Sequence, residues 1–133
     1  VGASFNYTDL VNGADQFAAG VQWAINLNPF VYYGEFDLKR VIFDDEDSTN
    51  GLIAFHEFNY QLSRGVYAKL KYDWADANIN FKDDQKHRFQ VGMDVHPYTF
   101  VDLEAGLRVN WTPRVDFTDV ASTELFMIAH VWF

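Results

Sequence analysis

Apolar and polar residues alternate along most of this chain with a period of two. The clearest stretch is 16–28, where every second residue is apolar: Phe17, Ala19, Val21, Trp23, Ile25 and Leu27. A period of two sends successive side chains to opposite faces of an extended chain, whereas a helix would need a period near 3.6. The pattern therefore predicts amphipathic β-strands.

Eight such segments follow one another, at 2–10, 16–28, 30–40, 51–62, 66–76, 87–97, 100–111 and 123–133. The connections alternate between short turns (28–29, 63–65, 97–99) and long polar stretches (41–50, 77–86, 112–122). Strands joined by tight turns pair antiparallel. We therefore expect one all-β domain over residues 1–133, an antiparallel up-and-down transmembrane β-barrel of about eight strands. Closure of that barrel would pair 2–10 with 123–133.

The strand lengths fit a membrane. A tilted strand of roughly 9–11 residues crosses a hydrocarbon core, and outer-membrane barrels carry short turns at one end and long loops at the other. No run of about 18 apolar residues is present, so a transmembrane helix is not expected. An even strand number would place both chain ends on the short-turn side.

The two faces of the strands differ in charge. The apolar face is nearly free of charged residues, whereas the opposite face carries both signs, which would suit pairing inside a narrow tube. A solvated surface of a soluble barrel is the alternative, because its alternation has the same period. The expected lumen network comprises Glu35, Asp37, Glu57, Lys69, Lys71, Arg88, Asp94, Asp102, Glu104 and Arg108. A tight turn at 63–65 would set Glu57 opposite Lys71 or Lys69.

Aromatic residues on the apolar face favour the membrane alternative, because they gather near strand ends. Bilayer proteins place aromatic girdles at the two interfaces, whereas a soluble core would hold these rings centrally. The expected girdles are Phe30, Tyr32, Tyr60, Tyr98 and Phe133 by the short turns, and Trp74, Phe89 and Trp111 by the long loops.

Composition removes several function classes. The chain has no cysteine, which excludes disulfides, thiolate catalysis and covalent haem attachment within it. Its net charge of −9 argues against a nucleic-acid partner. We expect no cofactor.

The histidines give no persuasive catalytic site, and we expect no enzyme activity. His87 lies at a long-loop end near Asp83 and Asp84, where a solvated loop histidine is the simpler interpretation than a catalytic dyad. His96 lies by a short turn with Asp94 and Asp102 as possible neighbours, which favours a structural hydrogen bond. His130 faces the interior beside Trp132, and no nucleophile-elbow, zinc or phosphate-loop motif is present.

Two features remain open. His56 falls mid-strand on the face assigned to lipid, where a polar ring is costly, so either it contacts a membrane-protein partner or the register slips there. The acidic run Asp44, Asp45, Glu46 and Asp47 is a weak candidate for a divalent cation that bridges lipopolysaccharide phosphates, and a solvated loop is the simpler interpretation.

The last stretch, 125–133, resembles the closing strand of bacterial outer-membrane β-barrels, whose chains typically end in Phe after alternating apolar residues. The runs 66–73, 87–94 and 97–104 look like carboxy-terminal hairpins of larger porin-like barrels, including those that sheathe multihaem cytochromes; this narrower match covers about a third of the chain. Such barrels have more strands than 133 residues supply.

The resemblance implies a place in the bacterial outer membrane, in contact with membrane lipid and lipopolysaccharide. The expected role is structural, adhesive or that of a scaffold, through acidic external loops. Membership of a wider porin-like pore, for passive transport or for sheathing an electron-transfer partner, is the alternative. A soluble lipocalin-like ligand-binding barrel is the second alternative.

Overall fold

A computed structural model describes residues 1–10, 14–43, 48–81, 85–113 and 120–132. In these residues the chain forms eight strands: β1 (Gly2–Leu10), β2 (Ala14–Leu27), β3 (Phe30–Phe43), β4 (Thr49–Ser63), β5 (Val66–Asp76), β6 (Lys86–Tyr98), β7 (Val101–Thr112) and β8 (Val120–Val131). The boundaries follow the alternating pattern closely, the main differences being that β3 continues to Phe43 and β8 begins at Val120. None of the described residues belongs to a helix able to cross a membrane.

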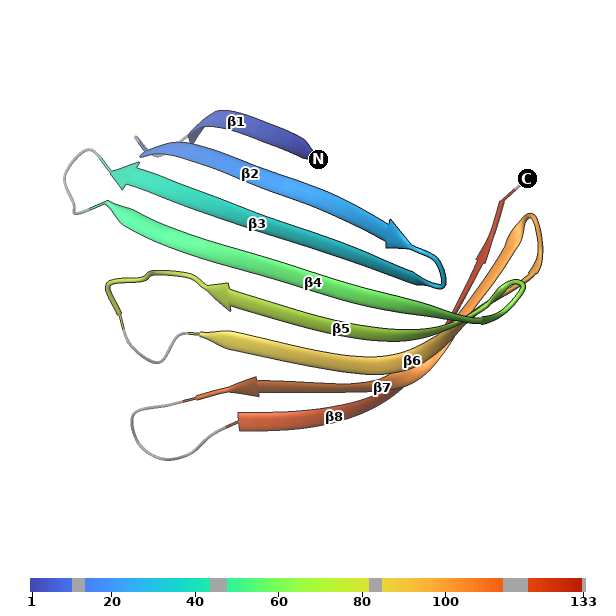
Figure 1. The fold of residues 1–133 in the computed structure, drawn as a ribbon. Coiled ribbons are helices and arrows are strands. Elements are labelled where there is room, and N and C mark those ends of the chain that lie inside the picture. Colours follow the sequence, from blue (N-terminus) through green and yellow to red (C-terminus); the bar gives the residue numbers. More distant parts are fainter. Residues whose placement is uncertain (11–13, 44–47, 82–84, 114–119, 133) are drawn as a thin grey trace.

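The strands lie side by side in chain order, each antiparallel to the next, and Figure 1 shows them curled into a trough. The short turns and the C-terminus gather at one end of the trough (right in Figure 1), and the longer connections at the other. At the β4–β5 turn, Gly65 has a φ of 75°, in the left-handed region that favours glycine. The expected all-β, antiparallel, up-and-down architecture is therefore confirmed.

The sheet is not closed, which corrects the expected pairing of 2–10 with 123–133. Among the described residues the strand order runs from β1 to β8 without a ladder between these two. β1 pairs with β2 only from Ala14 to Gln22, so the part of β2 nearest the short turns has no neighbour on that side. Closure depends on strand tilt and stagger summed around the whole sheet, and alternation along one strand contains no information about either.

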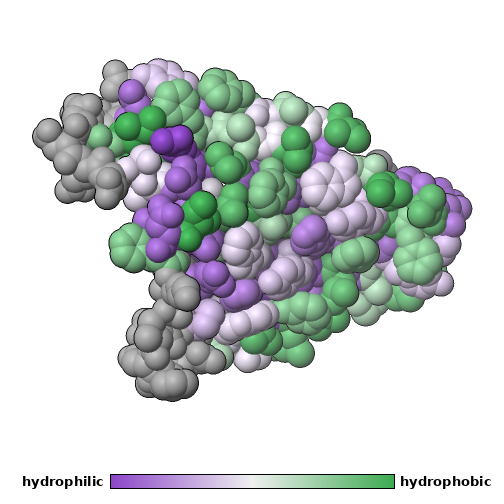
Figure 2. Space-filling model, turned by 60° about the vertical axis from the view of Figure 1, so that its left-hand side comes forward, coloured by the Kyte–Doolittle hydropathy of each residue, from purple (hydrophilic) through white to green (hydrophobic). Residues whose placement is uncertain are grey.

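The polar face of the sheet is the buried one. Gln90 is 3% exposed and Lys69 and Glu104 are each 8% exposed, whereas on the other face Val91 is 48% and Met127 81% exposed. Figure 2 shows hydrophobic side chains spread over the visible surface among polar ones. A water-soluble domain buries its apolar side chains and leaves charges outside. The burial here is the reverse, because the sheet curls toward its charged face.

Candidate functional site: the charge network on the inner face

A row of register partners crosses five strands, in the order Glu57, Lys71, Gln90, Arg108 and Glu124. Lys71 Nζ lies 3.1 Å from Glu57 Oε2, which confirms the predicted cross-strand pair. Arg108 donates to Gln90 Oε1 at 3.2 Å and lies 3.5 Å from Glu124 Oε2. Opposite charges on adjacent strands stabilise a sheet, so this row joins β4 to β8.

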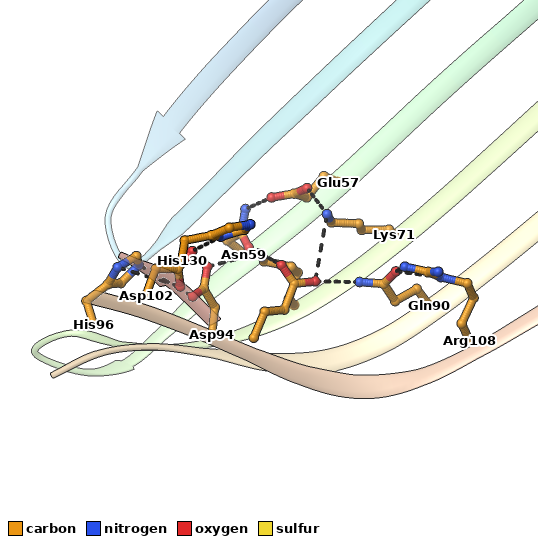
Figure 3. A network of polar contacts seen from close by, with 11 residues as sticks. Glu57, Asn59, Lys71, Gln90, Asp94, His96, Asp102, Arg108 and His130 are labelled. Carbon is orange, nitrogen blue, oxygen red and sulfur yellow. Dashed lines mark hydrogen bonds and ion pairs between the residues drawn. The ribbon is translucent and has the colours of Figure 1, made fainter. Parts of the chain in front are cut away.

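Lys69 pairs with two carboxylates of the network, whose labelled members are drawn in Figure 3. Its Nζ lies 2.9 Å from both Asp94 Oδ2 and Glu104 Oε2. The other oxygen of Glu104 accepts a 2.6 Å hydrogen bond from Gln90 Nε2 and lies 3.9 Å from Lys71 Nζ. Buried charges are tolerated only when paired and hydrogen-bonded, and each of these carboxylates has a cation beside it.

Two glycines lie beside Lys69, where β6 and β7 approach each other closely. Lys69 pairs with Gly92 on β6, and Gly92 pairs with Gly106 on β7. A Cβ atom on Gly106 would overlap the carbonyl oxygen of Val91, so β6 and β7 approach each other closely here. From β5, Lys69 contacts Asp94 on the neighbouring strand β6 and Glu104 on β7, one strand further.

The other predicted lumen charges lie outside this core. Arg88 lies toward the long connections, 3.7 Å from Asp73 Oδ2, and donates to Asn110 Oδ1 at 3.0 Å. Glu35 and Asp37 are half-buried on β3, and no ion pair of the described residues joins them to the network. The network is thus concentrated on β4 to β8.

Neutral and unpredicted residues complete the network. Gln90 links Glu104 to Arg108, and Asn59 donates to Glu57 Oε1 at 2.7 Å. Both lie at the same parity as the charged residues of their strands, which is the signal that could have identified them.

A second polar cluster lies at the short-turn end of the same face. His96 Nε2 is 3.6 Å from Asp94 Oδ1 and His96 Nδ1 is 3.9 Å from Asp102 Oδ1. His130 Nδ1 lies 3.2 Å from Asp102 Oδ2. The sequence predicted Asp94, His96 and Asp102 as neighbours. The hydrogen bond expected for the His96 side chain is wrong, because its distances to the two carboxylates exceed hydrogen-bond range.

The predicted girdle residues of the apolar face form ring contacts at both ends. By the short turns, the Phe30 and Tyr60 rings lie 4.7 Å apart, and the exposed Tyr98 stacks on Phe100. At the other end Trp111 stacks on His87 at 4.6 Å. Tyr32 belongs to the short-turn group, and Trp74 and Phe89 lie toward the long connections of β5 and β6. Phe133 lies outside the described residues.

His56 is accommodated within the sheet. Its register with Gly34 and Tyr72 is regular, so the predicted alternative of a register slip is wrong. The ring is half-buried; its Nδ1 shares a 2.8 Å hydrogen bond with the hydroxyl of Tyr32, and Trp23 packs edge-on against it. A partner contact at His56 stays a prediction.

His87 has a similar arrangement, and its interpretation as a solvated loop residue is wrong. It is half-buried on β6, where its Nδ1 is 3.0 Å from the hydroxyl of Tyr72 and its ring stacks on Trp111. Tyr72 could have indicated a hydrogen-bond partner for His87, but only once the register between β5 and β6 is known.

Substituting Tyr32 with phenylalanine should lower the free energy of unfolding by about 1 kcal/mol, because His56 Nδ1 then loses its hydrogen bond on an otherwise apolar face. Urea unfolding in detergent, followed by tryptophan fluorescence, measures the change. Tyr98→Phe, at an exposed ring, is the matched control and should be neutral. Equal values for the two variants would remove the Tyr32–His56 bond as a stabilising contact.

The acidic candidates Asp44, Asp45, Glu46 and Asp47 lie outside the described residues, so the cation proposed for them stays a prediction. The described fold and site define the chain as an all-β protein with one curled antiparallel sheet and a charged inner face. No protein-family model matches the chain, and neither does any curated protein or solved structure.

Proposed function

We propose that this chain forms the wall of a bacterial outer-membrane β-barrel, with its apolar face in contact with lipid and with a structural, adhesive or scaffold role. The supporting observation is the reversed burial: Lys69, Glu104 and Gln90 are among the most buried polar side chains, while the large apolar residues of the opposite face lie exposed. Such an arrangement is costly in water and favourable in a bilayer.

The extent of the exposed apolar surface strengthens this proposal. Exposed Leu, Val, Ile, Met and Phe residues occur on every strand of the sheet, including Phe36, Val91 and Leu107. Soluble monomers rarely expose contiguous apolar patches larger than a few hundred Å². Lipid tails would cover this surface, and the ring contacts at both ends of the strands would lie at the two interfaces.

The inner network argues for a mechanical role. Side chains of β4 to β8 hold one another through ion pairs, so the charged face stiffens the wall. On this proposal the long connections face outward, where acidic loops meet lipopolysaccharide or a partner, and no catalysis is assigned to the chain.

The open sheet favours a second candidate, in which these strands belong to a wider porin-like pore. Unpaired backbone groups on a strand edge cannot face hydrocarbon, since each one costs several kcal/mol there. β1 and β8 each present such an edge, because no ladder joins them in the described part of the chain. Further strands would satisfy both edges and widen the lumen, for passive transport or for enclosing an electron-transfer partner.

Planar-bilayer recordings on the chain, folded in detergent and shown by heat-modifiable gel migration to be a folded barrel, test both candidates. A filled barrel of eight strands should give no steady conductance, whereas a wider pore should give regular steps on the order of a nanosiemens. A chain that remains monodisperse without detergent would overturn both, in favour of the soluble lipocalin-like alternative.

A further inference from the structure

The polar cluster at the short-turn end has the composition of a metal site. Among the described residues, Asp94, His96 and Asp102 each offer one ligand atom, and these atoms lie within 4.8 Å of one another. Imidazole nitrogen with carboxylate oxygen is a donor set used for Zn²⁺ and other first-row divalent ions. The proposed function assigns no role to this cluster.

Each carboxylate in the cluster has one oxygen held and one oxygen facing His96. Asp94 Oδ2 is 2.9 Å from Lys69 Nζ, and Asp102 Oδ2 is 3.2 Å from His130 Nδ1. The remaining oxygens, Asp94 Oδ1 and Asp102 Oδ1, are buried without a hydrogen-bond partner. Buried oxygens are rarely left unpaired in proteins, so these two indicate a missing positive group between them.

The third ligand is positioned by its backbone and by a neighbouring ring. The His96 N–H donates to Gly65 O at 2.7 Å, and the Tyr67 ring packs edge-on to the imidazole at 5.7 Å. The His96 side chain is 43% exposed, so an ion can enter from solvent. The β6–β7 pairs before the register shift, Asp94–Glu104 and Val95–Leu103, already place His96 beside Asp102 at the turn.

For one ion to bind, the three ligand atoms, which lie within 4.8 Å of one another, must move closer together. Tetrahedral Zn²⁺ with ligands at about 2.0–2.2 Å sets neighbouring donor atoms about 3.4 Å apart. His96 Nε2 lies 3.6 Å from Asp94 Oδ1, and the other ring nitrogen, Nδ1, lies 3.9 Å from Asp102 Oδ1. Rotation of the exposed imidazole brings one ring nitrogen into range, while Lys69 and His130 keep the carboxylates in place.

We propose that Asp94, His96 and Asp102 bind one divalent transition-metal ion of the Zn²⁺ class, with water as the fourth ligand and with His130 orienting Asp102 through its contact with Oδ2. The ion would bridge β6 and β7 at their turn and, through His130, attach the last strand to them. The rival explanation is a protonated His96 that neutralises the two oxygens without any metal.

Zn²⁺ titration of the whole chain, folded in detergent without a histidine tag, tests this proposal. Competition against a chromogenic chelator should give one saturable site per chain, and Co²⁺ in place of Zn²⁺ should give visible absorption bands. His96→Gln and Asp102→Asn should each abolish the site, whereas His130→Gln, a positioning variant, should weaken it about 10-fold. Heat-modifiable migration confirms that each variant is folded.

His87→Gln is the matched control, since His87 lies on the opposite face, and it should leave the affinity unchanged. Absence of a saturable site in the unaltered chain would overturn the proposal and favour the protonated histidine. Equal affinity in His96→Gln and His87→Gln would also overturn it, because the metal would then bind elsewhere. Neither result would affect the proposed membrane location, which the conductance and solubility experiments test.

Discussion

Replacing Lys69 with methionine should lower the free energy of unfolding by about 3–5 kcal/mol. The substitution keeps an unbranched side chain that is one atom shorter and removes the ammonium charge. Asp94 and Glu104, whose side chains are 13% and 10% exposed, would then face each other without the ammonium that lies 2.9 Å from both. Urea titration of the folded chain in detergent, followed by its tryptophan fluorescence, measures the loss.

Lys39→Met is the matched control, because Lys39 lies on the same inner face of the sheet, on β3, but is exposed. This substitution should change the free energy of unfolding by less than about 0.5 kcal/mol. Adding Glu104→Gln to Lys69→Met should recover part of the loss, with a coupling of about 0.5–3 kcal/mol, since one of the two unpaired anions is removed. A loss no greater than that of the control would show that the network does not stabilise the fold.

Introducing arginine at Val91 should destabilise the folded chain in lipid vesicles by about 2–4 kcal/mol. Val91 lies near the middle of β6 on the apolar face, between Leu70 and Leu107 on the neighbouring strands. In a bilayer this places a guanidinium at the depth of the lipid tails. In water the same side chain would lie on an open surface, because Val91 is 48% exposed, and the substitution would be nearly neutral.

Tyr98→Arg is the control for depth, since Tyr98 ends β6 at the short turns, where an arginine reaches the interface and should cost no more than about 1 kcal/mol. The measurement is the unfolding free energy of each variant in vesicles. A cost at Val91 equal to or below that at Tyr98 would contradict the placement of this face against lipid.

The strands and their two faces could be predicted from the sequence because a period of two is a local property. The same is true of the Glu57–Lys71 pair, since the tight turn at 63–65 fixes the β4–β5 register within a few residues. Gln90 and Asn59 were not predicted as network residues because they carry no formal charge, although both alternate in step with the charged residues of their strands.

The remaining features depend on relations between distant segments. His130 meets Asp102 through the β7–β8 register, and the long connection after Thr112 leaves that register unspecified by the sequence. The open edge between β1 and β8 likewise reflects tilt and stagger accumulated over the whole sheet.

Each strand of the sheet pairs only with its neighbours in the chain, within the part that the structure describes. The architecture is therefore modular: duplication or deletion of one hairpin would change the circumference without requiring a new kind of connection. Evolution could therefore change the number of strands in the sheet by two at a time, while keeping a hairpin such as β5–β6 with its Lys69–Asp94 ion pair.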